Sequence, residues 1–222
     1  MKLTTESYEA QLARWPRSGR HILAQFDSDS VVVYQAYRPS IGRFAAEHGY
    51  FGGEFSLGRM SWIKPNFLWM MYRCGWGTKP DQEVVLAVRL RRAAFDEILA
   101  QAVPSRFEAE LFATPAEFRA ALATSSVRLQ WDPDHDPSGA PVERRAIQLG
   151  LRGEVLRRYA REWIVDIQDV SPFIAGQRTH AGSAGWRDVV TPREETYPVT
   201  DPQVARRLGL TDKIPGSHVE ST

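Results

Sequence analysis

Residues 59–79 read RMSWIKPNFLWMMYRCGWGTK, and this stretch guides the interpretation of the whole chain. It places four cations, three tryptophans and a tyrosine in one short segment. Pro65 predicts the start of a short helix, because its missing N–H would be unpaired in the first turn anyway. Gly75 and Gly77 predict where that helix ends. Cations on both sides of a rigid aromatic element suit a flat, anionic ligand such as a nucleotide.

The bulk composition is that of an ordinary globular protein, and we expect a soluble, cytoplasmic one without a membrane partner. The chain has 222 residues, of which 43% are hydrophobic and 25% charged. A formal net charge of +1 gives no global attraction for nucleic acid, so such binding would need a local patch. The single cysteine, Cys74, excludes an intrachain disulfide and a cysteine-based zinc site. We find no apolar signal core near the start, and the apolar run 67–72 is too short to cross a bilayer.

Hydrophobic periodicity predicts strands and helices in mixed succession. The predicted strands are 21–26, 30–37, 83–90, 127–131, 145–150 and 163–170. The predicted helices are 6–15, 40–48, 93–102, one capped by Thr114, 154–163, 171–174 and 202–208. The run 83–90 is continuously apolar, as is typical of a central strand buried on both faces. The succession favours a single α+β domain over 1–179, built around one mixed, twisted sheet with flanking helices, and a partly ordered C-terminal extension over 180–222.

Several common catalytic motifs are missing from the sequence. There is no GxxxxGK[ST] or GxGxxG phosphate loop, no HExxH and no GxSxG. His135 stands among Asp132, Asp134 and Asp136, a cluster that fits either a metal site or a solvated turn. The turn is favoured, so we expect no metal. Cys74 follows an arginine, which would lower a thiol pKa, but a small buried filler is the favoured interpretation.

Four sequence words resemble those of one protein family. They are VYQAY at 33–37, the aromatic word at 59–76, QWDP at 130–133 and RAIQLGL at 145–151. Together they resemble the domain of unknown function 4291 family, over about residues 18–180. The resemblance implies a single soluble domain and points to these words, but it supplies no chemistry.

A second resemblance concerns arrangement only. A strand that ends in Tyr34–Tyr37, a helix over 40–48 and then Gly49–Phe51 is similar to the opening of ADP-ribosyltransferase domains. Those enzymes split a nicotinamide–ribose bond, which needs an aromatic ring for nicotinamide, cations for pyrophosphate and a polar group for the ribose hydroxyls. This chain departs from them in lacking the first-strand His or Arg and a Glu-x-Glu or Gln-x-Glu pair.

The resemblance and the aromatic segment together imply a site for NAD. Catalytic roles fall to Gln148, with Glu154 as its alternative, and to Tyr34. The predicted cofactor contacts are Tyr37, Arg38, Arg59, Trp62, Lys64 and Arg73. The N–H groups at the start of the helix after Pro65 would add to the anion site.

The strand over 30–37 also carries a buried polar residue. Tyr34 and Gln35 point to opposite faces of a regular strand. A buried Gln35 needs hydrogen-bond partners, which is a structural cost unless it serves a site.

Our first functional prediction is therefore a nucleotide- or NAD-binding enzyme, an ADP-ribosyltransferase-like transferase acting on a phosphate-bearing small molecule. The alternative is a non-catalytic module that binds RNA or single-stranded DNA. The basis for this alternative is a basic surface predicted from six arginines: Arg144, Arg145, Arg152, Arg157, Arg158 and Arg161. Glutamates are interleaved with these arginines, which favours ion pairing on a solvated helix. The sequence leaves the oligomeric state open.

Overall fold

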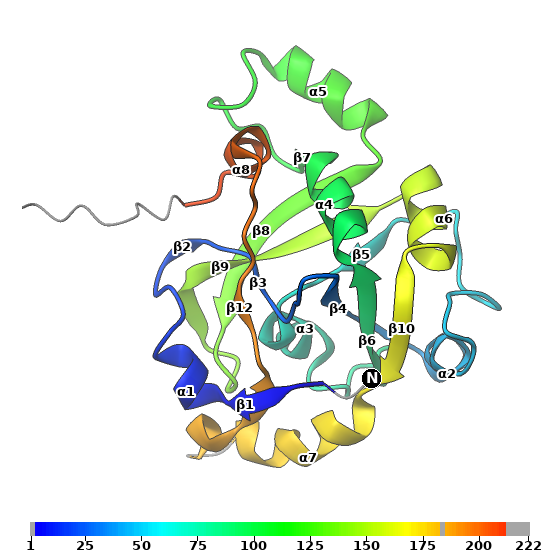
Figure 1. Ribbon diagram of the computed structural model, residues 1–222, viewed down its shortest axis with the longest axis vertical. Coiled ribbons are helices and arrows are strands. Elements are labelled where there is room, and N and C mark those ends of the chain that lie inside the picture. Colours follow the sequence, from blue (N-terminus) through cyan, green and yellow to red (C-terminus); the bar gives the residue numbers. More distant parts are fainter. Residues whose placement is uncertain (1–2, 183–184, 212–222) are drawn as a thin grey trace, which may run out of the picture.

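The computed structural model describes residues 3–182 and 185–211 (Figure 1). The helices are α1 (Tyr8–Leu12), α2 (Pro39–His48), α3 (Phe67–Cys74), α4 (Arg92–Ala100), α5 (Pro115–Thr124), α6 (Gly153–Arg161), α7 (Ser171–Ala181) and α8 (Pro202–Leu208), with a 3-10 turn, η1 (Trp186–Asp188). The longer strands are β4 (Ser30–Tyr37), β6 (Val84–Arg91), β8 (Val127–His135), β9 (Pro141–Leu151) and β10 (Ile164–Asp169). The shorter ones are β1 (Thr5–Ser7), β2 (Gly19–Arg20), β3 (Leu23–Ala24), β5 (Ser61–Ile63), β7 (Ala102–Pro104), β11 (Val190–Pro192) and β12 (Glu195–Thr196). No helix in the described ranges combines the length and apolarity that a bilayer crossing requires.

The fold is α+β, as predicted, but its described strands form four sheets where one was expected. A three-stranded antiparallel sheet has the order β10-β6-β4, so β6 is the central strand, as predicted. A mixed five-stranded sheet has the order β2-β9-β8-β7, with β5 also paired to β9. The two remaining sheets are the pairs β1-β11 and β12-β3. An isolated bridge between Tyr34 and Lys64 connects β4 with the end of β5, and there the two larger sheets meet.

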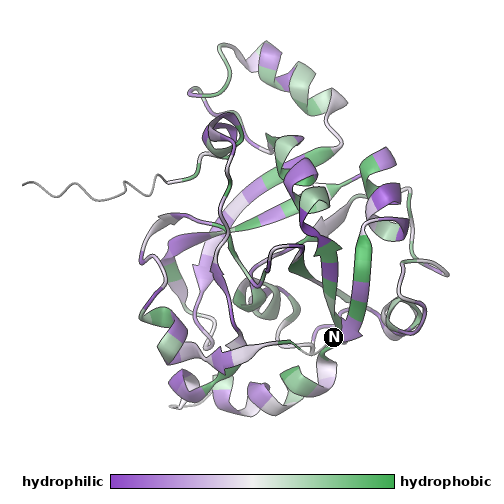
Figure 2. Cartoon of the chain, in the orientation of Figure 1, coloured by the Kyte–Doolittle hydropathy of each residue, from purple (hydrophilic) through white to green (hydrophobic). Residues whose placement is uncertain are grey.

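Two hydrophobic clusters cover the opposite faces of the three-stranded sheet. Alternate residues of β4 divide between them, because successive side chains on a strand face opposite ways. Val31 and Val33 join the larger cluster, which includes residues of α4, α6, β8 and β9. Val32 and Tyr34 join the second, which includes residues of α3 and Tyr8 of α1. Hydrophobic and hydrophilic bands also alternate along β10 at the sheet edge (Figure 2).

The aromatic helix α3 begins later than the sequence predicted. Asn66, not Pro65, is its N-cap, and the Asn66 side chain accepts a hydrogen bond from the Trp69 N–H at 2.7 Å. The asparagine side-chain oxygen accepts from an N–H in the first turn that has no partner within the helix. The helix therefore starts after Asn66 and not at Pro65. The helix ends at Gly75, which is left-handed at φ 59°, as predicted.

The start of α3 is not available to a ligand, contrary to our expectation. The Phe67 N–H donates to the Glu194 carboxyl at 2.6 Å, and the Asn66 amide lies 3.4 Å from the same group. Glu194 is fully buried and comes from a segment 127 residues further along the chain. The Glu194 oxygen thereby satisfies an N–H that the first turn of a helix leaves without an intrahelical partner.

The solvated turn expected at Asp132–Asp136 is, as far as His135, part of a long hairpin, which corrects the sequence interpretation. β8 continues to His135 and pairs with β9 in an antiparallel register. The hairpin includes a buried ion pair, because Arg144 on β9 lies 2.6 Å from Asp134 on β8. Arg144 was expected on a basic surface, yet only 3% of it is exposed. The ion pair offsets the cost of burying both charged side chains. Residues whose local propensity predicts a turn can therefore form part of a strand.

The described part of the predicted C-terminal extension packs against the rest of the chain. The helix expected over 171–174 continues to Ala181, so the predicted boundary at residue 179 lies within α7. Beyond it, β11 pairs with β1, and Tyr197 and Leu208 belong to the larger hydrophobic cluster. Residues 212–222 lie outside the described ranges, and the division into domain and extension stays a prediction.

Candidate functional site

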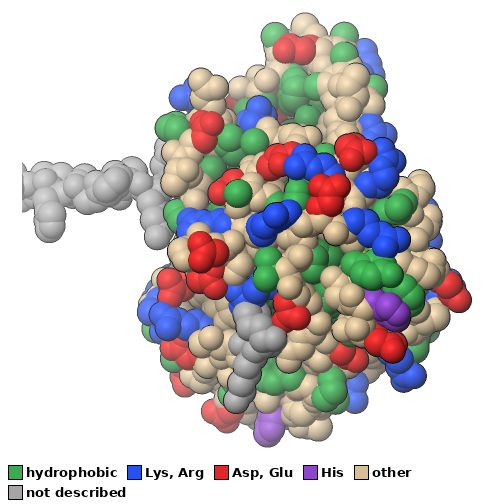
Figure 3. Space-filling view, turned by 45° about the vertical axis from the view of Figure 1, so that its right-hand side comes forward, with side chains coloured by type: hydrophobic (Ala, Val, Ile, Leu, Met, Phe, Trp, Pro, Cys, Tyr) green, Lys and Arg blue, Asp and Glu red, His purple; other side chains and the backbone are tan. Residues whose placement is uncertain are grey.

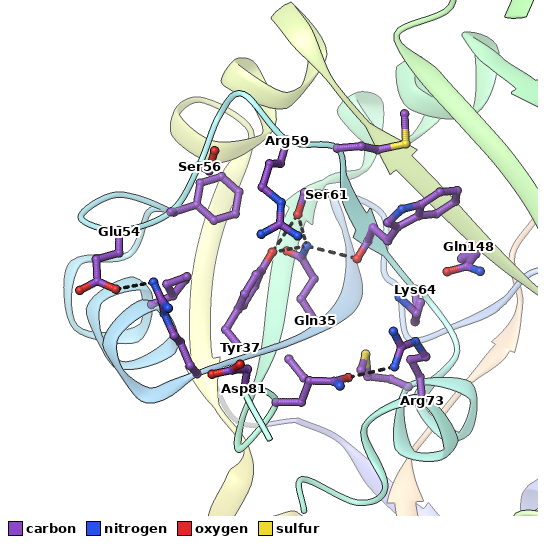
Figure 4. A pocket seen from close by; sticks show the side chains of 18 of the residues that line it. Gln35, Tyr37, Glu54, Ser56, Arg59, Ser61, Lys64, Arg73, Asp81 and Gln148 are labelled. Atoms are coloured by element: carbon purple, nitrogen blue, oxygen red, sulfur yellow. Dashed lines mark hydrogen bonds and ion pairs between the residues drawn. The ribbon is translucent and has the colours of Figure 1, made fainter. Parts of the chain in front are cut away.

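A pocket of about 680 Å³ opens where the two larger sheets meet. This volume lies within the range of small-molecule sites. The end of β4, strand β5 and helix α3 contribute to its wall, together with the loop before β5 and the β8–β9 hairpin. Its charged and amide-bearing lining residues are Arg38, Arg59, Lys64, Arg73, Glu54, Asp81, Gln35, Gln82, Gln130 and Gln148. Figure 4 shows many of these side chains converging on the cavity.

The structure brings most of the predicted site residues together. Those that line the pocket are Tyr37, Arg38, Arg59, Trp62, Lys64, Arg73 and Gln148. Tyr34 does not line it, because the alternation of β4 turns its ring to the opposite face of the sheet. The Tyr34 ring is fully buried and packs edge-on against Phe67 at a centroid distance of 5.4 Å. We therefore remove Tyr34 from the candidate site. Glu154, the alternative to Gln148, is paired with Arg157 on α6.

Gln35 organises a hydrogen-bonded network at one end of the pocket. Its amide nitrogen lies 2.8 Å from the Tyr37 hydroxyl and 2.9 Å from the Ser61 hydroxyl. The two hydroxyls are also 2.8 Å apart, and the Gln35 oxygen accepts from the Tyr159 hydroxyl. The network meets the need for partners that the sequence predicted for a buried Gln35. It also fixes the Tyr37 and Ser61 hydroxyls at the pocket wall.

The Tyr37 phenol stays protonated in this environment. Desolvation raises the pKa of Tyr37 above its ordinary value, against the opposing effects of the Ser61 hydrogen bond and the Arg59 charge. Arg59 extends over this end of the pocket, near Tyr37 and Ser61 (Figure 4). This part of the wall therefore offers a guanidinium and two neutral hydroxyl groups.

A carboxylate fixes two amides at the other end of the pocket. Asp132 accepts from the Gln148 amide nitrogen at 2.7 Å and from the Gln130 amide nitrogen at 3.0 Å. Gln130 and Gln148 face each other across the β8–β9 register. Since their N–H groups bind Asp132, the amide oxygens remain as acceptors for a ligand hydroxyl or amine.

Lys64 places an ammonium group in the pocket with little access to bulk water. Only 5% of the residue is exposed, and its backbone is held by both hydrogen bonds of the Tyr34 bridge. Within the described ranges its side chain has no hydrogen bond and no ion pair. Burial, and after it the nearby Arg73 charge, lower the pKa of Lys64 to about 8, while Asp132 and Cys74 act in the opposite direction.

The other three cations differ in how far they are neutralised. Arg38 forms an ion pair of 2.6 Å with Glu54 at the exposed rim. Arg73 contacts the uncharged Gln82 at 3.4 Å, and for Arg59 no carboxylate partner is found among the described residues. Arg59, Lys64 and Arg73 therefore keep a positive charge that a ligand anion can neutralise.

Trp62 supplies an aromatic surface beside these charges. It lies on β5 opposite Gly150 of β9 and is partly exposed. A Cβ atom on Gly150 would lie 3.0 Å from the Trp62 ring and 2.6 Å from the Met60 sulfur. The glycine therefore lets the indole lie close against the strand.

Sequence reasoning missed several lining residues. Ser61 on β5 and Gln130 on β8 come from separate strands, and no local spacing signalled that they would meet. The available signal was a glutamine inside a predicted strand, which was used for Gln35 and could also have been applied to Gln130.

The cysteine and the acidic cluster near His135 have structural roles. Cys74 is fully buried, and burial raises its thiol pKa, as fits a core residue. Asp134 pairs with Arg144, whereas Asp136 accepts from Ser138 and closes the hairpin turn. Over the described ranges, no three His, Cys, Asp or Glu side chains are grouped as a metal site requires.

A family model described as "Domain of unknown function (DUF4291)" matches residues 21–197, which include the whole pocket. The chain belongs to this family. No curated protein matches the chain. The family match gives no support to the resemblance to ADP-ribosyltransferase domains, which stays a prediction.

Proposed function

We propose that this chain is an enzyme that binds a phosphate-bearing nucleotide in the pocket between its two larger sheets. The observation that carries the proposal is the unneutralised charge of Arg59, Lys64 and Arg73 inside a 680 Å³ cavity. Lys64 is buried whereas Arg59 and Arg73 are exposed, so the cost of burying an unpaired charge falls on Lys64 and is offset where an anion binds beside it. A ligand phosphate would supply the acceptors that these three cations lack.

Other residues that line the pocket would contact the base and the sugar of the nucleotide. The Trp62 ring offers a face on which a base or nicotinamide would stack. The amide oxygen of Gln148, oriented by Asp132, would accept a hydrogen bond from a ribose hydroxyl. Tyr37 and Ser61 would donate to, or accept from, the polar groups that remain.

NAD is the nucleotide we propose first, with transfer of its ADP-ribosyl group to an acceptor. A dinucleotide needs both an aromatic contact and cations for its pyrophosphate, and the pocket offers both. Transfer would release nicotinamide. We further propose a cytoplasmic location, which suits a chain whose single cysteine is a free thiol.

A thermal-shift series with NAD, ADP-ribose, nucleoside triphosphates and inorganic phosphate tests binding. A ligand at one hundred times its dissociation constant stabilises a protein by about 2.7 kcal/mol, which raises the midpoint of a chain of this size by about 5–11 °C. We expect the shift to be lost in Arg59→Ala combined with Arg73→Ala. It should persist in Arg43→Ala, which removes an exposed α2 cation outside the pocket.

Failure has two distinct forms. If no nucleotide shifts the midpoint, the nucleotide proposal is wrong. If NAD binds but releases no nicotinamide over hours, as measured by chromatography, only the transfer reaction is wrong.

An RNA or single-stranded DNA module is the alternative, but three of its six proposed arginines are ion-paired or buried. Arg157 pairs with Glu154, Arg158 pairs with Glu97, and Arg144 is buried. Figure 3 shows positive and negative side chains interspersed over the visible face. A labelled oligonucleotide whose affinity falls steeply with salt would favour this alternative.

A further inference from the structure

Lys64 differs from the other pocket cations in ways that suit a reacting group. An arginine remains charged in proteins, whereas a lysine becomes a nucleophile once its ammonium loses a proton. Lys64 is 5% exposed, and its main chain is fixed by hydrogen bonds of 2.7 and 3.2 Å to Tyr34. The backbone that carries the side chain is therefore held in place at the end of β5, and the side chain lines the cavity (Figure 4).

The surroundings of Lys64 favour the neutral amine. No carboxylate within the described ranges pairs with its nitrogen, and Arg73 on α3 is a neighbouring cation. Burial beside a second positive charge is an established way to activate a lysine nucleophile. With the pKa of Lys64 lowered to about 8, roughly a tenth of the side chains are neutral at pH 7. Asp132 on β8 and Cys74 on α3 oppose this effect without removing it.

We propose that the Lys64 amine forms an imine with the carbonyl carbon of a phosphate-bearing aldehyde held by Arg59 and Arg73. Ring-opened sugar phosphates belong to this class, as does the free ribose end of ADP-ribose. This step rests on the proposed function for its anion, but it goes further in assigning a covalent role to one residue.

The reaction balances without an oxidant or a reductant. The neutral amine nitrogen adds to the carbonyl carbon, and one N–H proton passes to the carbonyl oxygen to give a carbinolamine. The C–O bond then breaks, and the oxygen leaves as water with the second N–H proton. The products are the C=N imine and one water molecule. Hydroxyls of Tyr37 and Ser61 also line the pocket and would hydrogen-bond the sugar.

Trapping of the imine by cyanoborohydride tests the assignment in the unmodified protein. The chain has four lysines, so peptide mass spectrometry can follow each of them. With ribose 5-phosphate we expect Lys64 to be modified at least tenfold faster than Lys79. Lys79 is exposed and hydrogen-bonded to the Arg73 carbonyl, which makes it an internal control on the same segment. Ribose without the phosphate should react at Lys64 at least tenfold more slowly.

A variant separates a chemical role from a structural one. Lys64→Met removes a buried, unpaired ammonium, so we expect the thermal midpoint to stay level or rise while trapping at this position is lost. Modification of wild-type Lys64 should increase with pH around a midpoint near 8. Equal labelling of Lys79 and Lys64, or no effect of the phosphate, overturns the proposal.

The outcomes also distinguish this inference from the proposed function. Nucleotide-induced thermal shifts without any trapping refute the imine and leave nucleotide binding intact. Trapping by ribose 5-phosphate in a protein that no nucleotide stabilises supports the imine and refutes nucleotide binding.

Discussion

Replacement of Glu194 by glutamine should make the protein more stable at neutral pH, although it removes an ionisable residue that caps a helix. Glu194 is fully buried and accepts the Phe67 N–H at 2.6 Å, so it supports the start of the helix that carries Arg73. Burial raises the pKa of Glu194 well above 4.5. Asp134 adds to this rise, whereas the Phe67 hydrogen bond and Arg144 oppose it.

The sign of the pH dependence follows from proton linkage. Because the folded-state pKa is raised, the folded protein holds a proton on Glu194 that the unfolded chain releases above about pH 4.5. This stabilisation is complete below pH 4.5 and is lost as the pH rises through the folded-state pKa. One proton corresponds to a decrease of at most about 1.4 kcal/mol in unfolding free energy per pH unit. A glutamine mimics the protonated carboxyl and still accepts from the Phe67 N–H.

Urea unfolding from pH 4.5 to 8.5, followed by tryptophan fluorescence, measures the effect. We expect Glu194→Gln to match the wild type near pH 4.5 and to exceed it increasingly as the pH rises. Glu195→Gln is a matched control, because the neighbouring Glu195 side chain is 53% exposed and ion-paired with Arg193. If Glu194→Gln and the wild type keep the same difference at every pH, Glu194 is ionised in the folded protein and the reasoning is wrong.

Three further predictions concern the scaffold and the pocket. Arg144→Met should lower the unfolding free energy by about 3–5 kcal/mol, because Asp134 is then buried without its partner; adding Asp134→Asn should recover part of the loss, and strictly additive urea-unfolding effects would contradict a coupled pair. Gly150→Ala should destabilise by about 1–3 kcal/mol and displace the Trp62 ring, so nucleotide-induced thermal shifts should shrink; an unchanged shift would place ligand binding elsewhere. The Cys74 thiol should resist a disulfide reagent at pH 8 until the protein unfolds, since burial raises its pKa, and rapid labelling of the folded protein would show that this helix opens readily.

The sequence correctly predicted those elements whose formation depends on residues close together in the chain. The continuous apolar run of 83–90 is the central strand β6, and Gly75 ends the aromatic helix where its conformational freedom predicted. The sequence also predicted that Tyr34 and Gln35 face opposite sides of β4. Because they do, Gln35 lines the pocket and Tyr34 does not.

Local patterns failed where distant residues decide the outcome. The strand residues around Asp134 were interpreted as a solvated turn, because nothing near Asp134 in sequence shows that Arg144 will neutralise it. The start of α3 was assigned to ligand binding, because nothing near Phe67 shows that Glu194 will occupy it. In both cases a polar group is buried only because its partner arrives from another strand or segment.

The sequence alone determined which side chains were available for the site: the cations and rings of 59–79 and the glutamines inside apolar strands. Only the tertiary structure decided which of them share a cavity. The meeting of β4, β5, β8 and β9 buries Lys64 without an acidic partner and sets Asp132 between Gln130 and Gln148. The charge and the hydrogen-bonding groups of a side chain follow from its residue type. Its burial and its ion-pair or hydrogen-bond partners depend on contacts with residues far away in the chain.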